Sequence, residues 1–309
     1  MAHRLRPIMI AVLGVFLVAL LLFELRERRP EPTFEGKSLG FWLHLYDSTL
    51  RQGVTVTDPI KHDEAAKAVR AIGSNAVPFL IEMIRFQGKG ADRRNSEGVC
   101  GFLALGPVGA GGALPLAEVL ASSNSSASQW AAGRALCAIG LPASNAVPNL
   151  MQATHSTNSL ARLISLFVLN NLRIDPEKVI PLLVQSFQDR EFDVQLEAIS
   201  GAGKWGAEAA RTVPDLVLVT KNKSPRLRRV ACGALGNIAN VPQVAIPALL
   251  DALHDPVPFV RAEAAWALGR FEAKARIAVP ALKELLHDED REVRSSAEKA
   301  LTAIDRASE

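Results

Sequence analysis

Residues of the types that bind metal ions or transfer protons gather at two places in the sequence. His62-Asp63-Glu64 and His287-Asp288-Glu289-Asp290 each set one imidazole beside carboxylates. Imidazole and carboxylate groups are common ligands of zinc and iron, and they also serve as general acids and bases. We interpret His62 and His287 as solvated residues at the starts of helices, and we predict neither a metal site nor a cofactor.

Nucleophiles and phosphate-binding loops are also scarce. Cys100, Cys137 and Cys232 are an odd number of isolated cysteines, which indicates neither a disulfide framework nor a metal site. The glycine-rich segment 106–112 follows no strand pattern, so it does not resemble the loops that cradle phosphates. No Walker motif, dinucleotide fingerprint or Gly-x-Ser-x-Gly motif occurs. We predict no catalytic residue, and the sequence favours a protein that is not an enzyme.

A fixed interval between prolines indicates how the helices that would position any site are arranged. Six prolines recur every 33 residues: Pro115, Pro148, Pro181, Pro214, Pro247 and Pro280. A period of this length is typical of one supersecondary unit copied head to tail. Upstream the interval lengthens, since Pro78 lies 37 residues before Pro115 with a polar stretch at 87–96 between them.

The kind of residue at each position of the unit also recurs. Eight residues after the proline stands a side chain able to cap a helix: Ser123, Ser156, Asp189, Asn222, Asp255 and Asp288. Seventeen residues after it stands a small residue: Ala132, Ser165, Ala198, Ala231, Ala264 and Ala297. The unit reads as a short helix with the proline in its first turn, a tight turn ending in the cap, and a longer helix. No alternating strand pattern occurs, so we predict an all-α fold.

Segments such as 255–269 and 288–294 resemble HEAT repeats in their short bacterial form. The family signature is a proline in the first helix, then an aspartate, then valine and arginine ending six residues later, as in Asp255 with Val260-Arg261. The arginine position holds Gln129, Arg162, Gln195, Arg228, Arg261 and Arg294. The resemblance covers residues 38–309. It implies a right-handed α-solenoid of about eight helix pairs, in which aspartates and arginines form a structural ladder between repeats.

Two enzyme classes share such repeats. Deoxyhypusine hydroxylase, a HEAT-repeat enzyme, binds iron through His-Glu pairs at the starts of second helices. The matching positions here are Ala262-Glu263, Leu196-Glu197 and Ser295-Ser296, which lack the histidine. The resemblance also reaches the bilin lyases, although no residue marks a chromophore site. A bilin-lyase-like enzyme, or a small-molecule binder that uses the solenoid groove, stays as the alternative function.

Outside the regular repeats the sequence predicts further helices. Ser38 is placed to cap a helix that buries Leu39, Trp42, Leu43 and Tyr46. Asp58-Pro59 is a cap and first turn for a helix that runs to Ile72. The last helix, from about Arg291 to Asp305, carries a polar outer face, which is typical of a terminal capping repeat.

An apolar run near the N-terminus predicts a membrane anchor. Residues 8–23 are apolar or glycine, and with Leu25 they approach the ~30 Å hydrocarbon core of a bilayer. No Ala-x-Ala cleavage site follows. We therefore expect a stub at 1–7, an uncleaved transmembrane signal anchor at 8–25 and a short stiff linker at 26–37, before the solenoid at 38–309. The short stub favours export of the solenoid to the periplasm, although the arginines flanking the anchor are nearly balanced.

Large apolar residues off the core stripe are the first candidate binding surface. They stand fifteen or nineteen residues after the proline: Trp130, Leu163, Phe167, Leu196 and Trp266. Other repeats fill these positions with Arg134, Arg229, Ser295 or Lys299, so the positions are not part of the core. We expect them to line a groove on the inner face of the solenoid, where aromatic side chains commonly carry binding energy. Local packing against an adjacent helix is the alternative.

A basic turn is the second candidate surface: Lys221, Lys223, Arg226, Arg228 and Arg229. It is either a docking patch for an acidic protein, polyanion or anionic lipid, or a solvated turn with Arg228 in the ladder. The net charge is only +3 and no aromatic residues interleave, so we predict no nucleic-acid binding. The favoured function is a non-catalytic, membrane-tethered scaffold that binds a protein partner.

Overall fold

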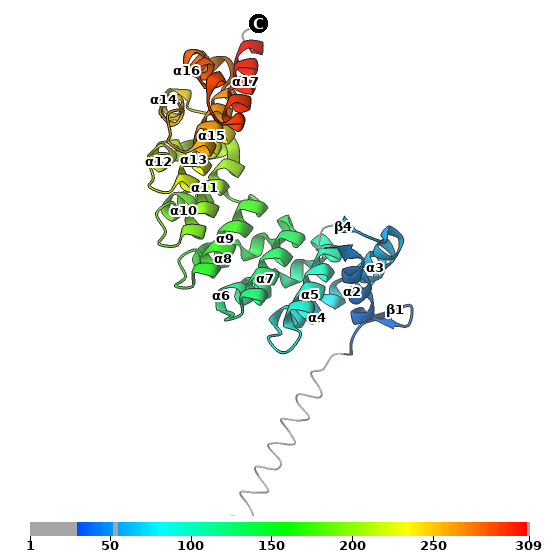
Figure 1. Ribbon diagram of the computed structural model, residues 1–309. Coiled ribbons are helices and arrows are strands. Elements are labelled where there is room, and N and C mark those ends of the chain that lie inside the picture. The colour runs from blue at the N-terminus through cyan, green and yellow to red at the C-terminus, as the bar shows by residue number, and fades with distance from the viewer. Residues whose placement is uncertain (1–29, 52–54, 308–309) are drawn as a thin grey trace, which may run out of the picture.

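The computed structural model of the protein describes residues 30–51 and 55–307. Within them, α-helices follow one another in pairs that stack into a curved solenoid (Figure 1). The first helices of the pairs are α2 (Leu39–Ser48), α4 (Val77–Arg85), α6 (Ala113–Ser122), α8 (Val147–Ala153), α10 (Pro176–Ser186), α12 (Val213–Val219), α14 (Pro242–Ala252) and α16 (Val279–Glu284). The second helices are α3 (Pro59–Ile72), α5 (Ala91–Leu105), α7 (Ser126–Ile139), α9 (Ser159–Leu172), α11 (Phe192–Trp205), α13 (Pro225–Ile238), α15 (Pro258–Gly269) and α17 (Arg291–Arg306). The predicted all-helical solenoid is confirmed.

The second helices from α5 to α17 pack against one another in sequence order and form one layer. The core lies between this layer and the first helices. The small residue predicted at position seventeen of each repeat is fully buried in all six: Ala132, Ser165, Ala198, Ala231, Ala264 and Ala297. At the N-terminal end, α2 buries the four predicted residues and α3 begins after its Asp58 cap. The sequence pattern therefore predicted the core stripe correctly.

Glycines bring the last four second helices into backbone contact. One glycine in each of α11, α13 and α15 faces an alanine of the next second helix: Gly203–Ala234, Gly236–Ala267 and Gly269–Ala300. A Cβ added at each of these glycines would lie 3.1, 2.8 and 2.9 Å, respectively, from the Cα of the facing alanine. Real Cβ atoms essentially never come closer than 3.0 Å to another heavy atom. Glycine is therefore required where α13 and α15 each approach the following helix.

The predicted helix caps are displaced by two residues. The side chain at position eight accepts a hydrogen bond from the backbone N–H two residues later, as in Ser125 N–H to Ser123 Oγ at 3.1 Å and Glu191 N–H to Asp189 Oδ1 at 2.9 Å. The N-cap is the residue that donates this bond, for example Ser125 for α7 and Glu191 for α11. The prediction that position eight caps the second helix was wrong, because these side chains close an Asx- or Ser-type turn that precedes the helix.

The recurring proline occupies two different places. It lies in the first turn of α6, α8, α12 and α16, as predicted. In α10 and α14 it lies inside the helix, as Pro181 and Pro247, because these helices begin earlier, at Pro176 and Pro242. In the other repeats the residues just before the first helix form a 3-10 turn instead: η1 (Gly73–Ala76), η2 (Gly106–Gly112), η3 (Leu141–Ala146), η4 (Gly206–Thr212) and η5 (Glu272–Ala278). A further turn, η6 (Leu285–His287), follows α16.

Two small hairpins depart from the all-helical prediction. Strands β1 (Thr33–Phe34) and β2 (Lys37–Ser38) pair antiparallel, as do β3 (Leu50–Arg51) and β4 (Thr55–Val56). Strands of two residues are too short to show an alternating pattern. The β1–β2 hairpin lies in the predicted linker, yet it contacts the solenoid, since the Trp42 indole N–H donates to the Phe34 carbonyl at 3.2 Å.

The predicted anchor at 8–25 and the stub at 1–7 lie outside the described residues. Within the described part, one helical stretch, Ala91–Ser122, is long and apolar enough to cross a membrane by length and composition. This stretch comprises α5, η2 and α6. Apolar side chains such as Phe102 and Leu116 are fully buried in it, so its composition is accounted for by packing in the solenoid.

Candidate partner-binding site

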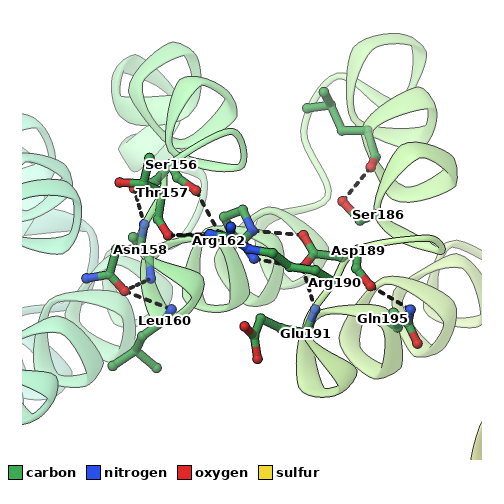
Figure 2. Close-up of polar contacts among 12 residues, drawn as sticks. Ser156, Thr157, Asn158, Leu160, Arg162, Ser186, Asp189, Arg190, Glu191 and Gln195 are labelled. Carbon is green, nitrogen blue, oxygen red and sulfur yellow. Dashed lines mark hydrogen bonds and ion pairs between the residues drawn. The ribbon is translucent and has the colours of Figure 1, made fainter.

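The inter-repeat ladder occupies the turns between paired helices. Arg162 of α9 donates to both carboxylate oxygens of Asp189 in the next repeat, at 2.8 and 2.7 Å (Figure 2). Its third nitrogen donates to the Ser156 carbonyl at 2.9 Å, so the guanidinium also fixes the turn of its own repeat. These bonds hold the pKa of Asp189 below its usual range and raise the pKa of Arg162. The predicted structural role of this pair is confirmed.

Charged and uncharged steps of the ladder are matched between neighbouring repeats. Each arginine that is followed by another repeat meets an aspartate 27 residues later: Arg162–Asp189, Arg228–Asp255 and Arg261–Asp288. Gln129 and Gln195 instead precede repeats that carry the uncharged Ser156 and Asn222. Gln195 Nε2 donates to the carbonyl of Asp189 in its own repeat at 2.6 Å. Each ladder aspartate is therefore paired with an arginine. The ladder residues hold neighbouring repeats together.

The predicted apolar stripe does not form one continuous row of exposed side chains. Trp130 of α7 is 37% exposed, and its ring meets the Phe167 ring of α9 edge-on, with centroids 5.8 Å apart. The Lys204 ammonium of α11 lies 5.7 Å from the Phe167 centroid. Leu163, Phe167 and Leu196 are partly buried and pack against the core. The local-packing alternative therefore describes these three residues.

Four of the five cations of the basic turn contact a neighbouring side chain. Besides Arg228 in the ladder, Lys221 Nζ lies 2.9 Å from Asp251 Oδ2, and Arg226 lies over the Phe192 ring at 5.5 Å. Arg229 Nε lies 4.0 Å from Glu263 Oε2. Lys223 is exposed at the turn. These four cations thus face four different neighbouring side chains.

The structure brings Trp266 and Arg229 together at a cavity that the sequence patterns did not predict. A hollow of about 250 Å³ crosses the second helices α13, α15 and α17. Besides Trp266 and Arg229 it is lined by Phe259, Glu263 and Glu292, with Ala262 and Ser296 completing the wall. Phe259, Glu263 and Trp266 follow one another at spacings of four and three residues, so they share one face of α15.

Two glycines of α13 make room for two of the side chains that line this cavity. A Cβ at Gly233 would lie 2.8 Å from Glu263 Oε1, and a Cβ at Gly236 would lie 3.0 Å from Cζ3 of Trp266. The Glu263 carboxylate and the Trp266 indole therefore lie against α13 where that helix has no side chain. Phe259 and Trp266 nevertheless stay 38% and 36% exposed. Large aromatic groups on a rigid helix layer are thus open to a partner.

Burial within the cavity raises the pKa of Glu263, against the opposing effect of Arg229 and with a further contribution from Glu292. Desolvation disfavours the ionised carboxylate, and the nearby second carboxylate repels it. Arg229 stands too far away for a hydrogen bond to offset this, because 4.0 Å exceeds hydrogen-bond length. Its guanidinium lies instead over the Phe259 ring, 5.8 Å from the centroid.

The histidines and cysteines that could in principle do chemistry lie in surroundings that indicate no catalytic or metal site among the described residues. His62 is partly buried, where its ring lies 4.0 Å from the Tyr46 ring and its Nδ1 lies 2.8 Å from Thr49 Oγ1; the expectation of a solvated residue was wrong for it. His287 is exposed, as expected. Across the described ranges, no three His, Cys, Asp or Glu side chains group closely enough to hold one metal ion. Burial raises the pKa of Cys137 to about 11 and of Cys100 to about 12, so neither is a thiolate at neutral pH.

Sequence and structure comparisons agree on the type of repeat. The HEAT repeats family profile matches residues 180–257 and 213–302, together about two-fifths of the chain. No curated protein matches the chain in sequence.

Among solved structures, a mutant of Kap121p superposes with a TM-score of 0.63 at 13% identity, over 87% of this chain and 33% of that one. Kap95p, in a structure describing its binding to RanGDP, superposes with a TM-score of 0.57 at 14% identity, over 88% of this chain and 40% of that one. The chain thus spans about a third to two-fifths of the length of these two proteins.

A third similar structure is the complex of CpcE and CpcF of phycocyanin lyase from Nostoc. It has a TM-score of 0.42 and 22% identity, and the match covers 51% of this chain and 98% of that one. Residues 180–302 thus match the HEAT repeats profile, and the described chain folds as a solenoid of stacked helix pairs.

Proposed function

We propose that this protein is a non-catalytic scaffold whose solenoid binds a protein partner on the exposed face of its second helices. The observation that carries the proposal is the cavity across α13, α15 and α17, where Phe259 and Trp266 stay more than a third exposed. Exposed aromatic anchors in a concave, rigid site are typical of the residues that dominate protein interfaces. Kap95p, which shares the fold, binds RanGDP.

We further propose that residues 8–25 tether the scaffold to a membrane and that the solenoid lies on the periplasmic side. The length and apolar character of 8–23 support the tether.

The size of the cavity favours a side chain of a protein over a small molecule. Pockets for drug-sized ligands enclose roughly 300–1,000 Å³. The hollow at Trp266, at about 250 Å³, is smaller than that range. A larger hollow of about 460 Å³ is lined, among the described residues, only by α3, from Pro59 to Lys67. One helix alone does not supply the convergent polar groups that a bilin-lyase-like activity requires.

Site-specific photo-crosslinking in the intact, membrane-associated protein tests the proposal. Benzoylphenylalanine is placed at Lys299, an exposed residue 33 positions after Trp266 and therefore at the equivalent place on the next second helix. We expect discrete protein adducts that Trp266→Ala reduces by about thirtyfold, since loss of a hot spot costs ~2 kcal/mol or more. The control places the crosslinker at Leu218, which is 70% exposed on the first helix α12. Equal adducts at both sites, or adducts unchanged by Trp266→Ala, would contradict the proposal.

A further inference from the structure

The cavity at Trp266 carries an unbalanced charge. Two carboxylates, Glu263 and Glu292, and one guanidinium, Arg229, line it. Arg229 and Glu263 approach only to 4.0 Å, and the Arg229 side chain is 51% exposed. Glu263 is less exposed, at 31%, so the more buried of the two charges has only a distant counterion. The site therefore favours an additional positive charge over a negative one.

Its walls favour the same kind of occupant. Phe259 and Trp266 line the hollow, and a cation within about 6 Å of an aromatic face is attracted by the ring quadrupole. A long apolar stem that ends in a cation matches walls of this kind, because the stem packs on the rings while the charge reaches the carboxylates. Lysine and arginine have this form.

We propose that the cavity receives a lysine or arginine side chain from a segment of the protein partner, held between Trp266 and Phe259 with its charge at Glu263 and Glu292. This inference rests on the proposed scaffold function and specifies which partner residue the site recognises. Arg229 acts as a competing cation, because it stands at the rim beside the same carboxylate. Burial of Glu263 strengthens the attraction, since a charge pair is less screened there than in water.

The test uses the full chain in detergent, labelled with 5-fluorotryptophan, and short peptides as probes. The first probe is an acetylated, amidated Gly-Ser-Arg-Ser-Gly peptide, and the second carries citrulline, a neutral near-isostere, in place of arginine. Fluorine NMR resolves the four tryptophans, and Trp266→Phe assigns the relevant resonance. Trp42 and Trp205 are buried, and Trp130 is as exposed as Trp266, so they serve as internal controls.

We expect the arginine peptide to shift the Trp266 resonance saturably at concentrations up to about 10 mM, and the citrulline peptide to bind about tenfold more weakly. Glu263→Gln lowers the affinity by about tenfold, while Arg229→Gln raises it about threefold, because the competing cation is gone. Equal affinity for both peptides, an equal shift at Trp130, or no saturable shift would overturn the proposal. If the Lys299 crosslinks still depend on Trp266 in that case, the scaffold function stands and only the basic character of the occupant fails.

Discussion

At the scale of single residues, the ladder shows that charge is matched between repeats. Arg228 and Asp255 have side chains only 13% and 8% exposed, and the guanidinium donates to both carboxylate oxygens. A charge left in such a site without its partner is costly, because neither water nor a counterion replaces the lost bonds. The natural Gln195–Asn222 step avoids this cost by omitting both charges.

A double-mutant cycle at this step follows from that matching. Arg228→Gln leaves Asp255 unpaired and is expected to lower the free energy of unfolding by about 2–4 kcal/mol. Adding Asp255→Asn restores at least ~1 kcal/mol, because the amide oxygen still accepts the Val257 N–H and no charge is stranded. Urea denaturation of the purified protein measures both values.

An exposed ion pair provides the control for this cycle. Lys221 and Asp251 are 59% and 66% exposed, so Lys221→Gln is expected to cost less than ~1 kcal/mol. If the losses from Arg228→Gln and Asp255→Asn simply add, the charges are not coupled and the matching has no energetic basis.

At the scale of the elements, the close packing of the second helices α11 to α17 depends on glycines, which have no side chain. Gly236 packs against the Ala267 backbone and beneath the Trp266 ring, and a Cβ there would lie 2.8 Å from Ala267 Cα. Alanine favours an isolated helix over glycine by about 1 kcal/mol. The clash with backbone atoms of α15 outweighs this gain, since rigid backbone moves less readily than a flexible side chain.

Gly236→Ala is therefore expected to lower the free energy of unfolding by about 1–3 kcal/mol and to perturb the environment of Trp266. Gly111→Ala is the matched control, because an added Cβ there has no atom within 4 Å. Denaturation midpoints report the stability, and Trp266 fluorescence or fluorine NMR reports the displacement. A Gly236→Ala protein as stable as the control would show that α13 and α15 can separate at no cost.

At the scale of the whole molecule, the solenoid presents its binding cavity near the C-terminal end, while the proposed tether precedes β1. Figure 1 shows α15 and α17 at the opposite end of the curved stack from α2 and α3. The cavity and strand β1, which follows the proposed tether in the sequence, thus lie at opposite ends of the stack.

Membrane fractionation tests the tether. Deletion of residues 1–29 is expected to move the protein from the alkali-resistant membrane fraction to the soluble fraction, because a span of about 20 apolar residues supplies the anchoring free energy. Far-ultraviolet circular dichroism of the deleted protein, compared with the full chain, controls for loss of the fold. If the folded protein that lacks residues 1–29 stayed in the membrane fraction, the membrane attachment would lie elsewhere in the chain.

Much of the fold followed from local patterns. The Ser38 and Asp58 caps and the buried stripe depend on residues at fixed spacings, which helical geometry turns into faces. The Arg162–Asp189 pair was expected from the resemblance to HEAT repeats. The prolines inside α10 and α14 were not predicted, because the start of each helix depends on the turn before it. The contact of His62 with Tyr46 was missed for a different reason: the two residues lie on separate helices.

The sequence alone determined that this chain is a stack of repeated helix pairs, because a rigid 33-residue period places a small buried residue at the same position of each unit. Its apolar N-terminal run likewise predicts an anchor. Only the tertiary structure decided which exposed residues form a site. Arg229, Trp266 and Glu292 lie on three different helices and meet at one cavity, since a contact between helices depends on how closely α13 approaches its neighbours. Gly236 allows that close approach, and its effect becomes visible only when the facing helix is in place.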